Sequence, residues 1–312
     1  MQWNILGHQT AIRFLQNHAK LANTRHAYLL TGPEGVGRET LALAFAKALN
    51  CLTPPSEGTF CDQCLPCRQI EELRYPDLTI LRVAEGSKDL KIDQIREMQK
   101  TLALAPYQST YRIVLIPDFQ RATIGASNAL LKSLEEPPSK AILILTADAR
   151  ESLLETIASR CEVLRLRPSS IEALETYLRE QKAINPNRAK RLAHLAGGRV
   201  GSAISFDQNQ DLLTAYDEAL ADLGELINSQ LRERLQYVEN LQKRKSASRE
   251  HFAFLVSVWL TFWRDVMIRR EGAEIPLVNI EHENQVSETA RLIPSEQIES
   301  ILNAHENALV NL

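Results

Sequence analysis

The stretch Thr31–Thr40 reads TGPEGVGRET, and it constrains the fold more than any other part of the chain. It follows the apolar run Ala27–Leu30 and precedes the helical pattern Leu41–Ala46. A buried strand, a glycine-rich turn and a helix in this order form the frame of a P-loop, G-x-x-x-x-G-K-[ST], which binds phosphate groups. We interpret the stretch as part of an NTPase scaffold. The alternative is a glycine-rich turn that never bound phosphate.

The chemistry of a working P-loop is missing from this frame. Arg38 stands at the lysine position, and a bulky planar guanidinium does not replace the compact ammonium that reaches the β- and γ-phosphates. Glu39 replaces the hydroxyl that binds Mg²⁺, and Thr40 lies one residue too late to supply it. The sequence therefore predicts a scaffold that has lost hydrolysis. The degenerate nucleotide-binding residues are Gly32, Gly35, Gly37, Arg38, Glu39 and Thr40.

Composition narrows the class of protein. A length of 312 residues suggests two or three domains, and 44% hydrophobic with 24% charged residues is typical of a globular protein. The sequence shows no apolar run near the ~20 residues of a membrane span and no features of a signal peptide, so we expect a cytoplasmic protein without a membrane partner. A net charge of -3 argues against a globally basic nucleic-acid binder, although a local patch remains open.

Short apolar runs recur through the first half of the chain, and a helical pattern follows each of them except the last. This alternation predicts βαβ units with a parallel five-stranded sheet. The predicted strands are Ala27–Leu30, Leu78–Val83, Arg112–Ile116, Ala141–Thr146 and Glu162–Leu166.

The second half reads as helical throughout. The predicted helices are Ile171–Gln181, Asn187–Ala196, Leu212–Leu226, Arg232–Gln242 and Phe252–Arg270. The last of these has apolar residues at helical spacing, which is typical of a core face rather than a ligand site. The most basic local cluster, Gln242–Glu250, reads either as an exposed loop between helices or as a nucleic-acid contact.

Four cysteines form a compact cluster between the P-loop helix and the next strand. Cys51, Cys61, Cys64 and Cys67 have the spacing C-x9-C-x2-C-x2-C, which suits a closed structural Zn²⁺ site with four thiolate ligands. An iron–sulfur cluster and free or redox-active thiols are the alternatives. The residues after Cys67 lack the C-x3-C-P continuation of a ferredoxin motif. The fifth cysteine, Cys161, is expected to be a packing residue.

Two further motifs carry a family resemblance. NALLKSLEEPP spans Asn128–Pro138, and Ser159-Arg160-Cys161 follows. Together with the P-loop frame and the cysteine module, they make residues 1–205 similar to the clamp-loader subunits of bacterial DNA polymerase III, which belong to the AAA+ class. The resemblance implies an α/β AAA+ core (1–166, with the cysteine module at 51–67), a small helical lid (167–207) and an all-α collar domain (208–312).

The resemblance also implies roles for individual positions. Active members of the family carry an Asp-Glu pair at the end of the third strand, and here those positions are Pro117 and Asp118. Their lid arginine would fall near Gly201, with Arg199 close by. These departures, together with the altered loop, match the non-hydrolysing member of the loader. Arg160 would then be an arginine finger acting on a neighbouring subunit, with an ordinary surface arginine as the alternative.

The partners implied by the resemblance are the loader's ATPase subunits and its delta subunit, and through the complex the sliding clamp and primed DNA. Structural Zn²⁺ is the implied cofactor, and ATP binding is left open. Two rival functions are an active loader ATPase of the gamma or tau type and a stand-alone zinc-dependent DNA-binding protein. The altered positions of the P-loop count against the first rival, and the net charge counts against the second.

Overall fold

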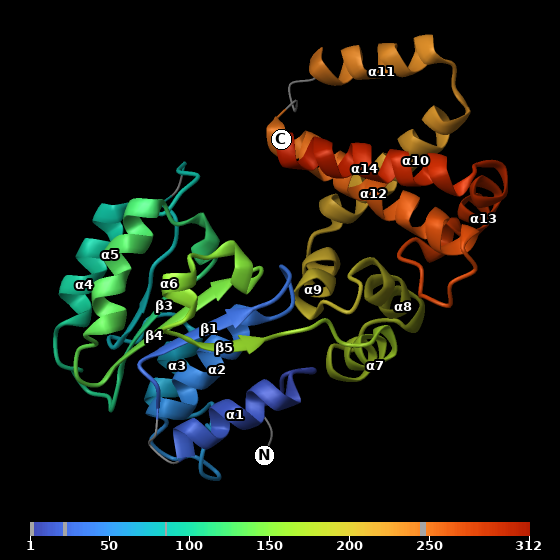
Figure 1. Cartoon of the computed structure of the whole chain (residues 1–312). Helices are drawn as coiled ribbons and strands as arrows, with labels where there is room; N and C mark the ends of the chain where they lie inside the picture. The colour runs from blue at the N-terminus through green and yellow to red at the C-terminus, as the bar shows by residue number, and fades with distance from the viewer. Residues whose placement is uncertain (1–2, 21–23, 85, 244–247) are drawn as a thin grey trace. The chain divides into compact units, whose positions relative to one another are not determined.

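The computed structural model consists of two compact units (Figure 1). The residues that it describes are 3–20, 24–84, 86–243 and 248–312. Unit 1 contains Met1–Ser169 together with Arg199–Gly201, and unit 2 contains Ser170–Gly198 together with Ser202–Leu312. The centre of the basic run noted above, residues 244–247, lies outside the described residues. Its role as a loop or a nucleic-acid contact stays a prediction.

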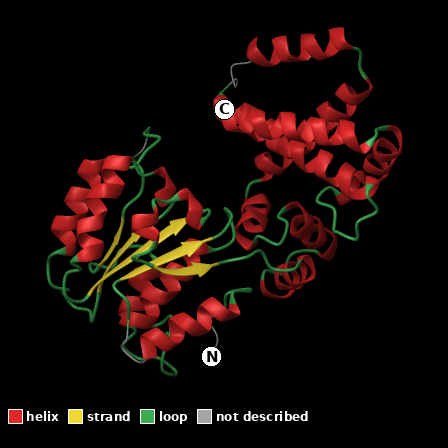
Figure 2. Ribbon diagram, in the orientation of Figure 1, coloured by secondary structure: helices red, strands yellow, loops and turns green. Residues whose placement is uncertain are grey.

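Unit 1 is built on a five-stranded sheet in the order β2-β3-β4-β1-β5, in which all neighbours are parallel (Figure 2). The strands are β1 (Ala27–Thr31), β2 (Leu78–Ile80), β3 (Arg112–Ile116), β4 (Ala141–Ala147) and β5 (Glu162–Arg165). The predicted parallel sheet is therefore confirmed. Strand β2 ends earlier than predicted, although the N–H of Leu81 still donates to the carbonyl oxygen of Leu115 at 2.9 Å.

Helices cover both faces of the sheet, which explains why its central strands are apolar on both sides. Tyr28 and Leu30 of β1 pack into the cluster formed with helices α1 and α2, whereas Leu29 packs into the cluster formed with α4, α5 and α6 (Figure 1). The helices of unit 1 are α1 (Gln9–Lys20), α2 (Arg38–Asn50), α3 (Leu65–Glu71), α4 (Ile92–Leu102), α5 (Ile124–Glu135) and α6 (Glu155–Ala158), with 3₁₀ turns η1 (Phe119–Arg121) and η2 (Arg150–Ser152).

The sheet order brings the carboxyl ends of β3, β4 and β1 together at one edge. In open α/β sheets this edge is where ligands bind. The P-loop begins there, because the N–H of Gly32 donates to the carbonyl oxygens of both Ala147 and Asp148 at 3.1 Å. Segments that are far apart in the sequence thus meet at the start of helix α2.

Unit 2 is entirely helical within its described residues. Its elements are α7 (Ile171–Gln181), α8 (Pro186–Leu195), α9 (Val200–Gln208, whose first two residues belong to unit 1), α10 (Gln210–Asn228), α11 (Leu231–Lys243), α12 (Arg249–Arg270), η3 (Ile280–His282), α13 (Glu283–Leu292) and α14 (Ser295–Asn311). The predicted lid and collar segments fall largely within this one unit, so their separation into two domains stays a prediction.

Helix α12 differs from the expectation that the chain has no apolar run near the length of a membrane span. It is 22 residues long and, by length and composition alone, apolar enough to cross a membrane. Its predicted apolar stripe packs into the core of unit 2, where Val258 and Phe262 are buried. Asp265 is also fully buried and accepts hydrogen bonds from the N–H groups of Val278 and Asn279. The helix therefore has the environment of a core helix of a helical domain.

Candidate functional site

The glycine frame of the P-loop has the backbone that the sequence predicts. Gly37 precedes helix α2 with φ 102°, a conformation that residues with a Cβ rarely adopt. At Gly32 a Cβ atom would lie 2.6 Å from the carbonyl oxygen of Leu166, so only glycine fits. The loop between β1 and α2 therefore needs glycine at Gly32 and Gly37, as the predicted frame requires.

Arg38 lies buried at the centre of the site and forms ion pairs with two partly exposed carboxylates. Its side chain is 8% exposed, and its guanidinium lies 2.9 Å from Asp118 Oδ1 and 2.7 Å from Asp148 Oδ1. The two carboxylates follow β3 and β4, so the fork joins the start of α2 to two strand ends. Gln120 Nε2 donates to Asp148 Oδ2 at 3.0 Å, and the N–H of Asp118 donates to Thr146 Oγ1 at 3.0 Å. Both terminal nitrogens of the guanidinium thus donate to carboxylates within the chain.

The next two residues of the motif face elsewhere. Glu39 forms an ion pair with Arg82, which follows β2, so its carboxylate already has a positive partner. Thr40 is exposed. The structure therefore places Arg38 in the centre of the site and Glu39 at its margin.

The predicted lid-arginine position lies directly on the P-loop. The N–H of Gly201 donates to the carbonyl oxygen of Gly35 at 2.8 Å, and a Cβ atom at Gly201 would lie 2.9 Å from that oxygen. The backbone of residue 201 is thus too close to the loop for a larger side chain without a shift. Arg199, the neighbouring candidate, lies in the same unit.

Two polar residues at the site escaped the sequence analysis. Asp148 is one of the partners of Arg38, and its position directly after a buried strand was the available signal. His8 lies 2.9 Å through Nε2 from the carbonyl oxygen of Val36, which attaches the segment before α1 to the loop. No motif in the sequence marks that contact.

Arg160 lies between α6 and β5 and is held by two contacts. Its Nη2 is 2.8 Å from Glu135 Oε1, and its Nη1 donates to the carbonyl oxygen of Thr156 at 3.0 Å. Glu135 ends helix α5 within the motif NALLKSLEEPP, so the two resemblance motifs meet in space. The side chain remains 37% exposed, so Arg160 lies at the surface of unit 1. The adjacent Cys161 packs against the apolar cluster, and burial raises the pKa of its thiol to about 12.

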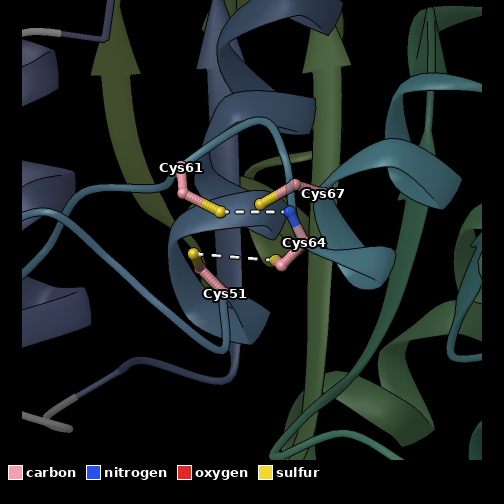
Figure 3. A group of neighbouring side chains, drawn as sticks. All are labelled: Cys51, Cys61, Cys64 and Cys67. Carbon is pink, nitrogen blue, oxygen red and sulfur yellow. Dashed lines mark hydrogen bonds between the residues drawn. The ribbon is translucent and has the colours of Figure 1, made fainter.

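The four predicted ligand cysteines come together in one cluster (Figure 3). Their sulfur atoms all lie within 4.8 Å of one another. A tetrahedral site with Zn–S bonds of about 2.3 Å has sulfur atoms about 3.8 Å apart. Cys51 Sγ and Cys64 Sγ are 3.9 Å apart, so the donor set and its dimensions fit a metal ion held by four sulfur ligands.

The pKa values of the thiols in the cluster are shifted in opposite directions by their surroundings. Hydrogen bonds from Thr53 Oγ1 at 3.4 Å and from the N–H of Cys64 at 3.2 Å lower the pKa of the Cys61 thiol to about 6. Burial instead raises the pKa of the thiols of Cys51 and Cys67. Metal binding at this cluster would therefore release protons from the buried thiols.

The segment between the first two cysteines is fastened to the core of unit 1. Trp3 Nε1 donates to the carbonyl oxygen of Gly58 at 3.1 Å, and a Cβ atom at Gly58 would lie only 2.4 Å from the carbonyl oxygen of Gln16 in α1. Phe60 packs 5.9 Å from the ring of Trp3. The cysteine module is thus an integrated part of the sheet's helical layer.

These features define an AAA+ protein: a parallel sheet of order β2-β3-β4-β1-β5, a P-loop between β1 and α2, and a helical unit beyond the last strand. The model of the family described as DNA polymerase III, delta subunit matches residues 7–170, just over half of the chain. The chain therefore belongs to this family.

Individual relatives come from several bacteria. The DNA polymerase III subunit delta' of Bacillus subtilis (strain 168) is 28% identical over 267 residues, which cover 86% of this chain and 74% of that protein. The subunit delta' of Pseudomonas aeruginosa is 33% identical over 178 residues, covering 57% and 54%. The subunit tau of Escherichia coli (strain K12) is 32% identical over 208 residues, covering 65% of this chain and 32% of tau. The match thus spans about a third of that longer relative.

Among solved structures, a gamma subunit-related protein from Thermotoga maritima aligns with 95% of this chain and 99% of its own. The TM-score is 0.45 and the sequence identity is 19%. A similarity at this level supports no conclusion about function.

Proposed function

We propose that this chain is the delta-prime subunit of a bacterial clamp loader and that it takes part in loading the sliding clamp onto primed DNA without hydrolysing ATP. The delta-prime relatives and the family match support membership of the complex. In this role the chain assembles with the loader's ATPase subunits and its delta subunit, and it meets the clamp and the DNA through the complex.

The main support for the proposed lack of ATP hydrolysis is the pairing of Arg38 with two carboxylates. In a working P-loop the lysine and the metal-binding groups act on the phosphates of the nucleotide. Here the cation at the lysine position is buried and neutralised by Asp118 and Asp148. Pro117 offers no side-chain ligand for Mg²⁺, and Glu39 brings a negative charge in place of a hydroxyl. The groups that would bind and activate ATP are thus replaced or already paired.

Arg160 is proposed as an arginine finger for an adjacent ATPase subunit. Its partly exposed side chain and its place in the Ser159-Arg160-Cys161 motif support this role. A guanidinium supplied in trans stabilises the charge that develops in phosphoryl transfer, and such groups contribute factors of about 10³–10⁵ in rate. The ion pair with Glu135 keeps this side chain oriented before assembly.

The cysteine cluster is proposed to hold one structural Zn²⁺ through Cys51, Cys61, Cys64 and Cys67. Four sulfur ligands leave no coordination position for water, so the role of the metal is to stabilise the module. We also assign residues 167–207 to a lid and 208–312 to a collar that mediates assembly.

Nucleotide binding and turnover by the purified chain test the proposed absence of hydrolysis. We expect no phosphate release from ATP above the buffer rate, whether or not a nucleotide binds weakly to the glycine frame. Arg38→Ala is compared with Arg82→Ala, which removes another arginine beside the loop. Steady phosphate release that is lost in Arg38→Ala and kept in Arg82→Ala would show that the loop is catalytic, and the chain would then be an active loader ATPase.

A further inference from the structure

A buried lysine of the P-loop helix lies against the cysteine module. The side chain of Lys47 in α2 is 9% exposed, and its Nζ is 2.6 Å from Asp62 Oδ1 and 2.6 Å from Glu71 Oε2. The ring of Phe60 lies 5.1 Å from the same nitrogen. A buried charge is costly unless it is paired, and here two carboxylates and an aromatic ring satisfy it.

Lys47 and its partner Glu71 each lie one helical turn from a ligand cysteine. Lys47 lies four residues before Cys51, which caps the carboxyl end of α2. Glu71 lies four residues after Cys67 in α3. Residues four apart lie on the same face of a helix, so the pair Lys47–Glu71 joins the two helix faces that carry these cysteines.

The third partner belongs to the turn that carries the other two cysteines. Asp62 directly follows Cys61 and has φ 56°, a left-handed conformation that costs free energy in a non-glycine residue. The turn also contains the hydrogen bond from the N–H of Cys64 to Cys61 Sγ. The ion pair with Lys47 therefore links this turn, which carries Cys61 and Cys64, to helix α2.

We propose that Lys47 is a positioning residue of the metal site, which holds the three segments that carry the four cysteines in their ligating arrangement. The inference rests on the proposed metal site. Groups that hydrogen-bond directly to ligating residues typically change metal affinity by about 10–100-fold, and Lys47, which acts through Asp62 and Glu71, should act at the lower end of this range.

The test measures how fast the full-length chain releases its metal. The chain is loaded with Co²⁺, whose thiolate-to-metal absorption reports the ligand set, and release is started with an excess of a chelator. We expect Lys47→Met to release the metal about 10-fold faster than the wild type. Lys47→Arg, which keeps the charge, should recover part of the difference.

The matched control is Lys20→Met. Lys20 pairs with Glu57 of the same module at 2.9 Å, but the two side chains are 50% and 71% exposed. This variant should release the metal at the wild-type rate. The thermal midpoint of each metal-loaded variant is recorded in parallel, because a folded variant with rapid release separates positioning from general destabilisation.

If Lys47→Met does not fold, Glu71→Gln and Asp62→Asn are measured instead, because each weakens one of the two ion pairs of Lys47. Faster release in these variants supports the inference. Release at the wild-type rate in Lys47→Met, or in both substitutes, overturns it while the metal site stands. A wild-type chain that takes up no Co²⁺ and no Zn²⁺ overturns the metal site and the positioning role together.

Discussion

The buried carboxylate of Asp77 is expected to be the most sensitive single polar group of unit 1. It lies between α3 and β2 with no exposed surface and accepts hydrogen bonds from the backbone N–H groups of Tyr107, Gln108 and Ser109 at 2.7 to 3.1 Å. Its Oδ1 is also 3.1 Å from Arg112 Nη2, whose side chain is 9% exposed. The carboxylate thus fixes the loop before β3 and neutralises a buried guanidinium.

Asp77→Ala removes both functions at once. Breaking a buried ion pair by removing one partner costs about 3–5 kcal/mol, because the other charge stays buried and unpaired. Net stabilities of about 5–15 kcal/mol make this a large loss. For a unit of this size it corresponds to a fall of roughly 10 °C in the thermal midpoint. Thermal unfolding followed by circular dichroism at pH 7 measures it.

The pH dependence of the free energy of unfolding tests the contacts of the Asp77 carboxylate without shortening its side chain. Burial alone would raise the pKa of Asp77, but the hydrogen bonds from Gln108, Tyr107 and Ser109 and the charge of Arg112 hold it below the usual value of 3.8. A lowered folded-state pKa contributes stability above the unfolded pKa, and this contribution is lost as the pH falls through the folded pKa. The wild type should therefore lose stability relative to Asp77→Asn below about pH 4.

Asp93→Asn is the matched control for this prediction. Asp93 also faces an arginine, Arg96, at 3.7 Å, but its side chain is 87% exposed. Exposed pairs contribute little, so the control should change stability by less than about 0.5 kcal/mol. Equal effects of Asp77→Asn and Asp93→Asn at pH 7 would refute the reasoning, because burial would then not distinguish the two carboxylates.

Three further outcomes are expected. Elemental analysis should find one zinc per chain and well under one in Cys64→Ser; iron, or an equal zinc content in both, would contradict the proposed site. Arg160→Ala should lower the ATPase rate of the assembled loader, and Arg160→Lys should restore little of it because the planar guanidinium is lost. The thermal midpoint of the isolated Arg160→Ala chain should stay close to that of the wild type. An unchanged ATPase rate with normal assembly would show that Arg160 is not an arginine finger. Gly201→Val should destabilise the contact with Gly35 and lower the thermal midpoint, whereas an unchanged midpoint would show that α9 can shift without cost.

Most of the sheet could be predicted from the sequence because its strands are short apolar runs that are buried on both faces. Arg112–Ile116 matches the predicted strand completely, since every residue in it is buried. Leu78–Val83 was predicted too long. Its last residues follow the apolar pattern, but β2 is an edge strand whose residues are only partly buried, so apolar character alone does not mark its end.

The candidate site was predictable only where its residues are close in the sequence. The spacing of the four cysteines was sufficient to expect that Cys51 and Cys67 meet, because the intervening segment is short. The pairing of Arg38 with Asp148 spans 110 positions and depends on the order of the strands, which the local pattern does not specify. Lys47 was missed for a related reason: a lysine in a helix is usually exposed, and only the packing of α3 and the cysteine turn buries this one.

Under the proposed function, the geometry of the ion cluster also predicts that Arg38→Lys alone would not confer ATP hydrolysis. The guanidinium of Arg38 spans two carboxylates on different strand ends, and the single ammonium group of a lysine cannot reproduce that fork. Lys at this position would leave Asp118 or Asp148 with less compensation, beside a nucleotide that is itself strongly negative. Pro117 would still offer no metal ligand to offset this repulsion. Arg38 is therefore paired within the chain without nucleotide, and several positions would have to change together before ATP could be bound and hydrolysed there.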